Sequence, residues 1–419
     1  GDIVAFGSEN GGKTRVYTFD ANSGPWGAWN KRGNDIVGAS SYDDSGKSIS
    51  LSADGNVVTV GEAGVNSDAG QARVFERSDG AGDWEQRGSS LAGSEANGKF
   101  GYTVTLSPDG LTLAVGATGE NGQKGNVYVY RYSGGEWGQI GLAIAGNAGD
   151  YLGSSLALST SGAVVAVGTS NADQIRVFEY DASLNWWFPR DAGVLSGQTS
   201  GDLFSVSMSM TPDGRTIAGG ATLGGVYPNL KKGQVSVYSC EACVADGSVP
   251  VASPPSPPAI PPPAVVTTWE QVGSYIIGTT SEMRFGSGVG LSHNGQTLIV
   301  GGKWKNSYKG EARVFTLSNG AWAQQGSTFT GDSTYDVLGT AVAISADGNV
   351  VALSAPGSGS GGHVAVYEWR ADLGNVWLQR GENIGGGSGD RAGSQIALSD
   401  SGDIVAFGSE NGGKTRVYT

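Results

Sequence analysis

The sequence contains few residues that could carry covalent or metal chemistry. Cys240 and Cys243 form a Cys-x-x-Cys pair, and the only histidines are His293 and His363. A structural zinc ion would need both histidines to join the two cysteines, and a thioredoxin-type redox centre would need a βαβ unit, for which there is no sequence signal. We therefore expect a disulfide between Cys240 and Cys243, formed in an extracellular setting, that fastens the chain just before a Pro-rich stretch.

Other candidate motifs for catalysis are equally weak. The stretch Ser8–Thr14 ends in Gly-Gly-Lys-Thr, but it lacks the first glycine of a phosphate-binding loop and precedes a predicted strand. No Gly-x-Ser-x-Gly sequence is present. Four carboxylates recur at the same place in the repeats described below, and we interpret them as turn residues that accept hydrogen bonds from backbone N–H groups. They are Asp150, Asp202, Asp336 and Asp390.

These residues must be positioned by a repeated unit, which is clearest over residues 100–146. Alternating apolar and small or polar residues predict strands at 102–107 and 126–132, with a short apolar strand at 111–116 between them. A fourth strand is expected from Trp137 onward. One such sheet cannot bury both of its faces, so several copies must pack against one another.

Two sequence features recur once in each repeat and give the number of copies. The first is a tight turn between the first and second strands, in which Asp-Gly or a similar pair tolerates positive φ angles. It recurs about every 53 residues at Gly55, Gly110, Gly162, Gly214, Gly295, Gly348 and Gly402, with one longer interval before Gly295. The second feature is a tryptophan that opens the fourth strand, which we interpret as a packing residue that covers the edge of the next blade: Trp29, Trp84, Trp137, Trp186 or Trp187, Trp269, Trp322 and Trp377.

Seven four-stranded units predict an all-β fold, a seven-bladed β-propeller with antiparallel blades. The composition agrees, because 72 of the 419 residues are glycine and only 16% are charged. A net charge of −13 argues against nucleic acid as a partner. The absence of a long apolar run argues against membrane insertion.

Two features interrupt this regular pattern. Residues 402–419 repeat residues 1–18 without a change. Either the native protein is a tandem array of propellers, which we favour, or the sequence is a permuted description of one ring. The second feature is the Pro-rich stretch 244–266, which favours polyproline II and falls between a third and a fourth strand. We expect it to be a linker or an insert that separates the blades of residues 1–243 from those of residues 267–419.

The repeated unit resembles the FG-GAP repeats of integrin α-subunit-like propellers. Phe100-Gly101, Phe285-Gly286 and Ala114–Ala117 carry the resemblance best. Some blades of that family hold calcium in an Asp-x-Asp-x-Asp-Gly loop, but the matching loops here lack this acidic spacing, so no metal site is carried over. No cofactor is expected either.

The Pro-rich stretch resembles the hydroxyproline-rich spacers of green-algal wall and flagellar-surface glycoproteins. That resemblance implies hydroxylation and O-glycosylation at Pro254, Pro255, Pro257, Pro258, Pro261, Pro262 and Pro263. It also implies an extracellular location, at the surface of the cell or of a flagellum.

We weigh two functions at this stage. The favoured hypothesis is a non-catalytic, structural or adhesive surface glycoprotein whose partners are other copies of the propeller or neighbouring glycoproteins. The alternative is a glycan- or ligand-binding propeller, or a glycan-active enzyme, that uses the central face. The alternative predicts a pocket with acids and aromatic residues drawn from the loops that precede the first strands. A face lined mainly by Gly, Ser and Thr would count against it.

Overall fold

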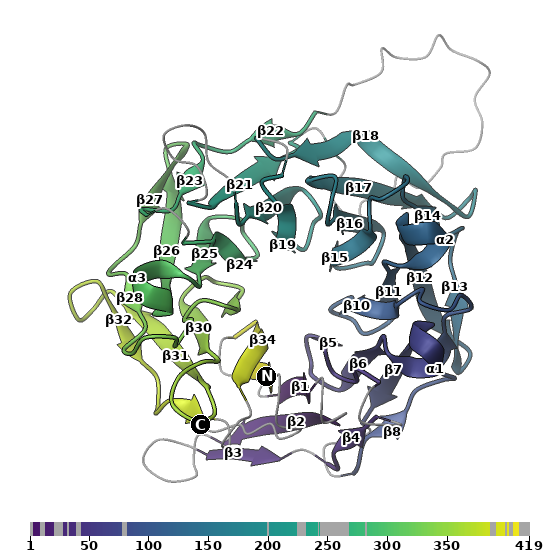
Figure 1. Cartoon of the computed structure of the whole chain (residues 1–419), viewed down its shortest axis with the longest axis horizontal. Coiled ribbons are helices and arrows are strands. Elements are labelled where there is room, and N and C mark those ends of the chain that lie inside the picture. Colours follow the sequence, from purple (N-terminus) through teal and green to yellow (C-terminus); the bar gives the residue numbers. More distant parts are fainter. Residues whose placement is uncertain are drawn as a thin grey trace.

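The computed structural model describes most of the chain, and the following account is confined to the described residues. These are residues 3–8, 13–20, 28–31, 33–38, 43–77, 82–198, 201–223, 232–241, 243, 268–280, 283–385, 391–398, 400–401 and 405–409. They form antiparallel sheets arranged in a ring around a central axis, as Figure 1 shows. The all-β propeller fold is thus confirmed.

Six of the seven sheets that the described strands form have the predicted order of first, second, third and fourth strand. In order along the chain, they are β5 (Ser48–Leu51), β6 (Val57–Glu62), β7 (Gln71–Glu76), β8 (Glu85–Gln86); β10 (Phe100–Leu106), β11 (Thr112–Ala117), β12 (Asn126–Ser133), β13 (Glu136–Gln139); β15 (Leu152–Leu158), β16 (Val164–Thr169), β17 (Gln174–Asp181), β18 (Trp186–Ser196); β19 (Phe204–Met210), β20 (Thr216–Ala221), β21 (Gln234–Ser239), β22 (Glu270–Gln271); β24 (Phe285–Leu291), β25 (Thr297–Gly302), β26 (Glu311–Ser318), β27 (Ala321–Gln324); and β29 (Val342–Ile344), β30 (Val350–Ala355), β31 (His363–Arg370), β32 (Val376–Gln379).

Short elements that the sequence did not predict complete the sheets. Two-residue strands pair with third strands: β4 (Ile36–Val37), β9 (Leu91–Ala92), β14 (Ile144–Ala145), β23 (Ile276–Ile277), β28 (Phe329–Thr330) and β33 (Ile384–Gly385). Three four-residue helical turns link second to third strands: α1 (Val65–Asp68), α2 (Glu120–Gln123) and α3 (Lys305–Tyr308). None of the described helices is long and apolar enough to cross a membrane.

The predicted tight turns between first and second strands are present. Between β10 and β11 the Ser107 hydroxyl donates a hydrogen bond of 2.5 Å to Asp109 Oδ1, and Gly110 has a φ of +68°. The same hydrogen bond recurs in the turns at Asp54, Asp213, Asn294 and Asp347. A positive φ is why glycine stands at the last position of this turn.

The hydrophobic core lies between neighbouring sheets. Every residue of the second strands β6, β11, β16, β25 and β30 is buried. One core cluster joins Val57 and Val74 of one sheet to Leu113 and Val115 of the next. Each sheet therefore supplies only half of the core at each of its faces, which is the physical reason that the units occur in series.

The repeated tryptophans pack between sheets, as predicted, although they cover the preceding blade rather than the following one. Trp137 donates a hydrogen bond of 2.9 Å from Nε1 to the carbonyl oxygen of Arg87, in the sheet before its own. Trp187, Trp322 and Trp377 make the equivalent bond to Ile140, Val272 and Gln325. The sequence left open whether Trp186 or Trp187 is the packing residue of its repeat. The structure assigns this role to Trp187, which is 5% exposed, whereas Trp186 is 45% exposed.

A glycine beneath each indole makes this contact possible. Gly88, with a φ of +72°, lies so close to Trp137 that a Cβ atom there would sit 2.9 Å from the indole Cδ1. Gly141, Gly273 and Gly326 stand in the same relation to Trp187, Trp322 and Trp377. The recurrent glycine a few residues after each tryptophan thus leaves space for the indole of the tryptophan in the next repeat.

The two identical segments lie side by side in the seventh sheet. Its strand order is β3 (Ala28–Lys31), β2 (Lys13–Asp20), β1 (Ile3–Ser8), β35 (Val405–Ser409) and β34 (Ala392–Leu398). β1 and β35 carry the same residues and touch in parallel at Ser8 and Ser409. β1 and β35 are therefore two copies of the second strand of this blade. β35 pairs with the first strand, β34, and β1 pairs with the third strand, β2.

The Pro-rich stretch interrupts a single sheet. β21 and β22 are neighbours, with Tyr238 opposite Gln271, so residues 244–266 are inserted between adjacent strands. These residues, including the seven proline candidates for glycosylation, lie outside the described residues, and the linker remains a prediction.

We predict that Gly88→Ala destabilises the ring more than Gly134→Ala does. Both glycines have a positive φ, +72° and +62°, but the space around the Cβ position of Gly134 is open. The difference isolates the clash with Trp137, for which we expect roughly 1–3 kcal/mol in the free energy of unfolding. Chemical denaturation of both variants measures it, and equal losses would contradict the role assigned to Gly88.

We also predict that deleting residues 402–419 hardly changes the melting temperature. The remaining copy, β1, has the residues needed to pair with β34 in the register that β35 now uses. Deleting residues 1–18 as well removes the second and third strands of this blade and should lower the melting temperature strongly. Circular dichroism during heating compares the three proteins, and a large loss from the single deletion would show that the two copies are not interchangeable.

Candidate functional site

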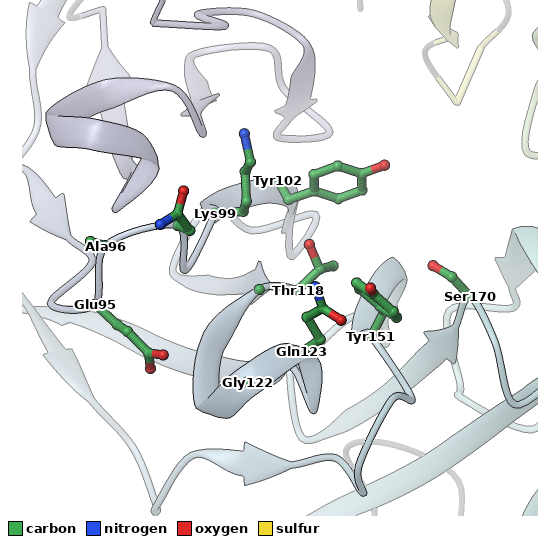
Figure 2. Close-up of a pocket in the computed structure, with 11 residues that line it drawn as sticks. Glu95, Ala96, Lys99, Tyr102, Thr118, Gly122, Gln123, Tyr151 and Ser170 are labelled. Atoms are coloured by element: carbon green, nitrogen blue, oxygen red, sulfur yellow. The ribbon is translucent and has the colours of Figure 1, made fainter.

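A pocket of about 550 Å³ opens at the end of the sheets where first strands begin and second strands end. Figure 2 shows its lining. The lining residues come from two consecutive blades and from the loop that leads into the first of them: Glu95, Ala96, Asn97, Lys99, Tyr102, Thr118, Gly119, Gly122, Gln123, Tyr151 and Ser170. The loops that precede β10 and β15 contribute to it, as the alternative hypothesis predicted for a binding face.

The segment before β10 is held by backbone hydrogen bonds to the preceding blade. The N–H groups of Asn97 and Lys99 donate to the carbonyl oxygens of Ser67 and Asp68, at 3.1 and 2.8 Å. Asn97 and Lys99 both have a positive φ, +62° and +58°. Non-glycine residues in this conformation are strained and are common at functional sites.

The α2 turn forms the floor and joins the pocket to the following blade. The N–H of Gly119 donates to the carbonyl oxygen of Gly98 at 3.0 Å, and the N–H of Tyr151 donates to the carbonyl oxygen of Gln123 at 3.1 Å. Gln123 and Tyr151 also have a positive φ, +70° and +50°. The lining of the pocket is thus fixed by contacts between blades rather than by any one repeat.

The charged groups of the lining are one carboxylate and one ammonium. Glu95 Oε2 accepts a hydrogen bond of 2.9 Å from the N–H of Asn121. Lys99 Nζ donates to Asp68 Oδ2 at 2.8 Å, and both side chains are partly exposed. Tyr102, Gln123 and Tyr151 add two phenols and an amide, which Figure 2 shows along one side of the cavity.

The first residue of α2, Glu120, is a buried carboxylate that ties this turn to β12. Glu120 is 3% exposed, and its Oε2 accepts hydrogen bonds from Asn126 Nδ2 at 2.8 Å and from the Tyr128 hydroxyl at 2.5 Å. Burial, together with the hydrogen bond to Glu120, raises the pKa of Tyr128 to about 12. Tyr128 therefore keeps its proton at physiological pH and continues to donate it to Glu120.

This set of groups fits a small polyhydroxylated ligand. Phenols, amides and hydroxyls can exchange hydrogen bonds with sugar hydroxyls, and the tyrosine rings offer apolar surface to a sugar ring. A carboxylate can accept a proton from water, and an ammonium can stabilise a developing oxyanion. The described lining holds one carboxylate, whereas a glycosidase uses a pair.

The residues singled out from the sequence are not brought into this pocket. Cys240 and Cys243 form a disulfide with Cα atoms 5.3 Å apart. Arg215 Nε donates to the carbonyl oxygen of Cys243 at 2.7 Å, which ties the end of β21 to the turn before β20. Within the described part of the chain, no group of three or more His, Cys, Asp or Glu residues could hold a metal ion.

The recurrent carboxylates have the predicted role in turns wherever they are described. Asp150, Asp202 and Asp336 are buried, and each accepts a backbone N–H, from Asn147, Phe204 and Ser333 respectively, at 2.7–2.9 Å. Asp390 lies outside the described residues. Sequence reasoning missed Glu95, Lys99, Tyr102 and Tyr151, because no motif links the segment 95–102 to Tyr151, which the next blade brings beside it.

Comparison with known proteins identifies relatives by fold alone. No family model matches the sequence, and no curated protein matches it. Among solved structures, a candidate 6-phosphogluconolactonase of Bacteroides uniformis shares 13% identity at a TM-score of 0.61, over 97% of this chain and 98% of its own. One of Bacteroides fragilis also shares 13% identity at 0.61, over 97% of both chains. The periplasmic gluconolactonase of Pseudomonas aeruginosa shares 16% identity at 0.59, over 92% of this chain and 96% of its own.

These neighbours support the propeller fold, and they do not support the FG-GAP identity or the algal surface context. They also overturn the prediction of a non-catalytic structural or adhesive protein, because three proteins that share this ring over nearly their whole length are described as lactonases. The prediction was wrong because it rested on the lack of a contiguous motif. In a ring of repeats, a site is assembled from loops that are about 50 residues apart in the sequence.

The two histidines lie outside the pocket, and one of them predicts a pH dependence. Burial lowers the pKa of His363 below its ordinary 6.5, against an opposing effect of Asp336 and Asp332. Below about pH 6.5 the unfolded chain binds a proton that the folded chain resists, so stability falls as the pH decreases from that value toward the folded-state pKa.

We predict that His363→Gln removes part of this loss of folding stability at acidic pH. Urea unfolding at about pH 7.5 and about pH 5.5 should show a smaller difference in stability for the variant than for the wild type. His293, whose Nε2 lies 3.3 Å from Asp400 Oδ1 at an exposed site, provides the control. His293→Gln should keep the wild-type difference in stability between the two pH values. If both variants reduce this difference equally, His363 is not its source.

Proposed function

We propose that this protein binds a sugar-derived lactone in the pocket formed by Glu95, Lys99, Tyr102, Gln123 and Tyr151 and hydrolyses the ring ester. The observation that carries the proposal is that a carboxylate, an ammonium and two phenols line one cavity of about 550 Å³. The likeness to proteins described as lactonases supports the choice of reaction.

The proposed reaction needs only groups that the pocket contains. Water adds to the carbonyl carbon of the lactone while Glu95 accepts its proton. The oxyanion that forms is stabilised by the Lys99 ammonium. The bond between the carbonyl carbon and the ring oxygen then breaks, the ring oxygen takes the proton from Glu95, and the product is a hydroxy acid.

The charges of the pocket favour an unphosphorylated lactone. Lys99 is the only cation of the lining, and it already bonds Asp68. A phosphate group would add negative charge to a protein of net charge −13, and the second cation beside the lining, Lys47 at 5.6 Å from the centre of the Tyr102 ring, already pairs with Asp44. We therefore expect glucono-δ-lactone to be a better substrate than its 6-phosphate.

An extracellular or periplasmic location belongs to the same proposal. The Cys240–Cys243 disulfide is typical of an oxidising compartment, and one structural neighbour is described as periplasmic.

Lactone hydrolysis above the spontaneous rate tests the proposal. Followed by acid release in a pH-stat, wild-type protein should accelerate the opening of glucono-δ-lactone, with a smaller effect on the 6-phosphate. Glu95→Gln and Lys99→Met should each lower kcat by about a hundredfold, because each removes a group that acts in the transition state.

Glu85→Gln is the matched control, since Glu85 is an exposed glutamate on β8 that does not line the pocket. It should retain wild-type activity. If neither lactone is opened faster than in buffer, or if all three variants behave alike, the proposal is wrong.

A second candidate is sugar binding without hydrolysis. The two tyrosines favour it, because Tyr102 and Tyr151 line the cavity with ring surface regardless of any proton transfer. In that case gluconate or glucose would bind, Tyr151→Ala would weaken the binding, and no variant would change a rate.

A further inference from the structure

On the opposite side of the ring from the pocket, three aromatic side chains form a cluster that we call the aromatic ledge: Trp304, Tyr308 and Tyr335. α3 carries Tyr308, and Figure 1 shows α3 across the ring from α2. The rings of Tyr308 and Tyr335 are stacked, 5.4 Å apart with 15° between their planes, and Trp304 meets Tyr308 edge-on at 5.5 Å. Tyr308 is 41% exposed and Tyr335 is 65% exposed.

The backbone at Tyr335 shows that this ring is held where the fold favours glycine. Tyr335 immediately precedes the buried Asp336, as Gly149 precedes Asp150 and Gly201 precedes Asp202. The two glycines have φ values of +77° and +82°, and Tyr335 has +70°. A bulky residue in this conformation is strained, so the turn carries a tyrosine at the expense of stability.

The turns being compared are equivalent in their hydrogen bonds. Asp150 Oδ2 and Asp336 Oδ2 each accept a backbone N–H at 2.7 Å from the residue three positions earlier. The next residues, Tyr151 and Val337, each donate an N–H to the carbonyl oxygen of the last residue of α2 or α3. Tyr335 therefore stands where another blade has glycine, in a turn with the same hydrogen bonds.

The surroundings of the ledge match a carbohydrate. A sugar ring has an apolar C–H face and a polar rim, and the ledge offers a broad ring face bordered by polar groups. Lys309, which follows Tyr308 in the sequence, donates from Nζ to the carbonyl oxygen of Asp332 at 2.7 Å, and Ser307 and Thr334 directly precede the two tyrosines.

Other ligands that bind aromatic rings fit less well. A quaternary ammonium needs rings that surround it, but Tyr308 and Tyr335 are nearly parallel and Trp304 is covered by the Arg284 guanidinium at 3.6 Å. A stacked nucleotide would bring phosphate to a protein of net charge −13.

We propose that the aromatic ledge is a second sugar-binding site, separate from the pocket, at which a pyranose unit of a neutral oligosaccharide stacks on the exposed face of Tyr335. It acts by binding alone and does not depend on lactone hydrolysis. An enzyme with such a site would be held near a glycan while its pocket acts on a small molecule.

Isothermal titration calorimetry with cellohexaose, xylohexaose, chitohexaose and maltohexaose tests the proposal. At least one of these probes should bind the wild-type protein at millimolar concentration. Tyr335→Gly should weaken that binding by about tenfold or more, and Tyr335→Phe, which keeps the ring, should change it by less than about threefold.

The glycine variant also separates binding from folding. It installs the residue that two other blades use at this turn, so its melting temperature should equal or exceed that of the wild type. Trp186→Ala removes an exposed aromatic side chain from β18, away from the ledge, and should leave binding unchanged.

Three outcomes would overturn the proposal: none of the four sugars binds, Tyr335→Gly binds as the wild type does, or Tyr335→Gly instead converts a dimer to a monomer in analytical ultracentrifugation. The last result would assign the ledge to contact between copies of the chain. None of these outcomes bears on lactone hydrolysis, which is measured as a rate.

Discussion

The contact between each indole and the glycine of the preceding sheet is the constraint on which the ring depends. Trp137 fills the space above Gly88 and donates its N–H to Arg87 one blade back, and the same arrangement recurs at Trp187, Trp322 and Trp377. The bond satisfies the indole N–H in a largely buried setting, while the glycine brings the two backbones close enough for it. The distance and angle between adjacent sheets are thereby fixed.

A second glycine contact acts at the other end of the blades, near the functional loops. Gly70 forms a parallel bridge with Phe100, and a Cβ atom there would lie 2.0 Å from the Phe100 carbonyl oxygen. Gly310 and Leu338 make the same contact beside the aromatic ledge. Because the third strand of one blade and the first strand of the next are held this closely, the loops between them can carry strained residues. The positive φ angles at Lys99, Tyr151 and Tyr335 occur there.

The pocket and the ledge are therefore two uses of one structural position. Gln123 and Tyr308 are each the last residue of a helical turn between a second and a third strand. Around Gln123 the neighbouring loops supply a carboxylate, an ammonium and phenols, whereas around Tyr308 they supply aromatic rings. The ring provides the same scaffold at both blades, and the two proposed functions differ only in the side chains that this scaffold carries.

The sequence by itself determined the blade: the turns with positive-φ glycines, the alternating strands and the tryptophan each depend on residues that are close along the chain, so local patterns revealed them. It also placed the carboxylates Asp150, Asp202 and Asp336 in turns, since an aspartate that bonds a nearby N–H is a local feature. Only the tertiary structure decided which residues form the pocket. The segment that carries Glu95 and Tyr102 and the loop that carries Tyr151 belong to different repeats and meet only when sheets pack, so no spacing in the sequence could reveal the site. The same reason explains why the lack of a contiguous motif was misread as the lack of a site.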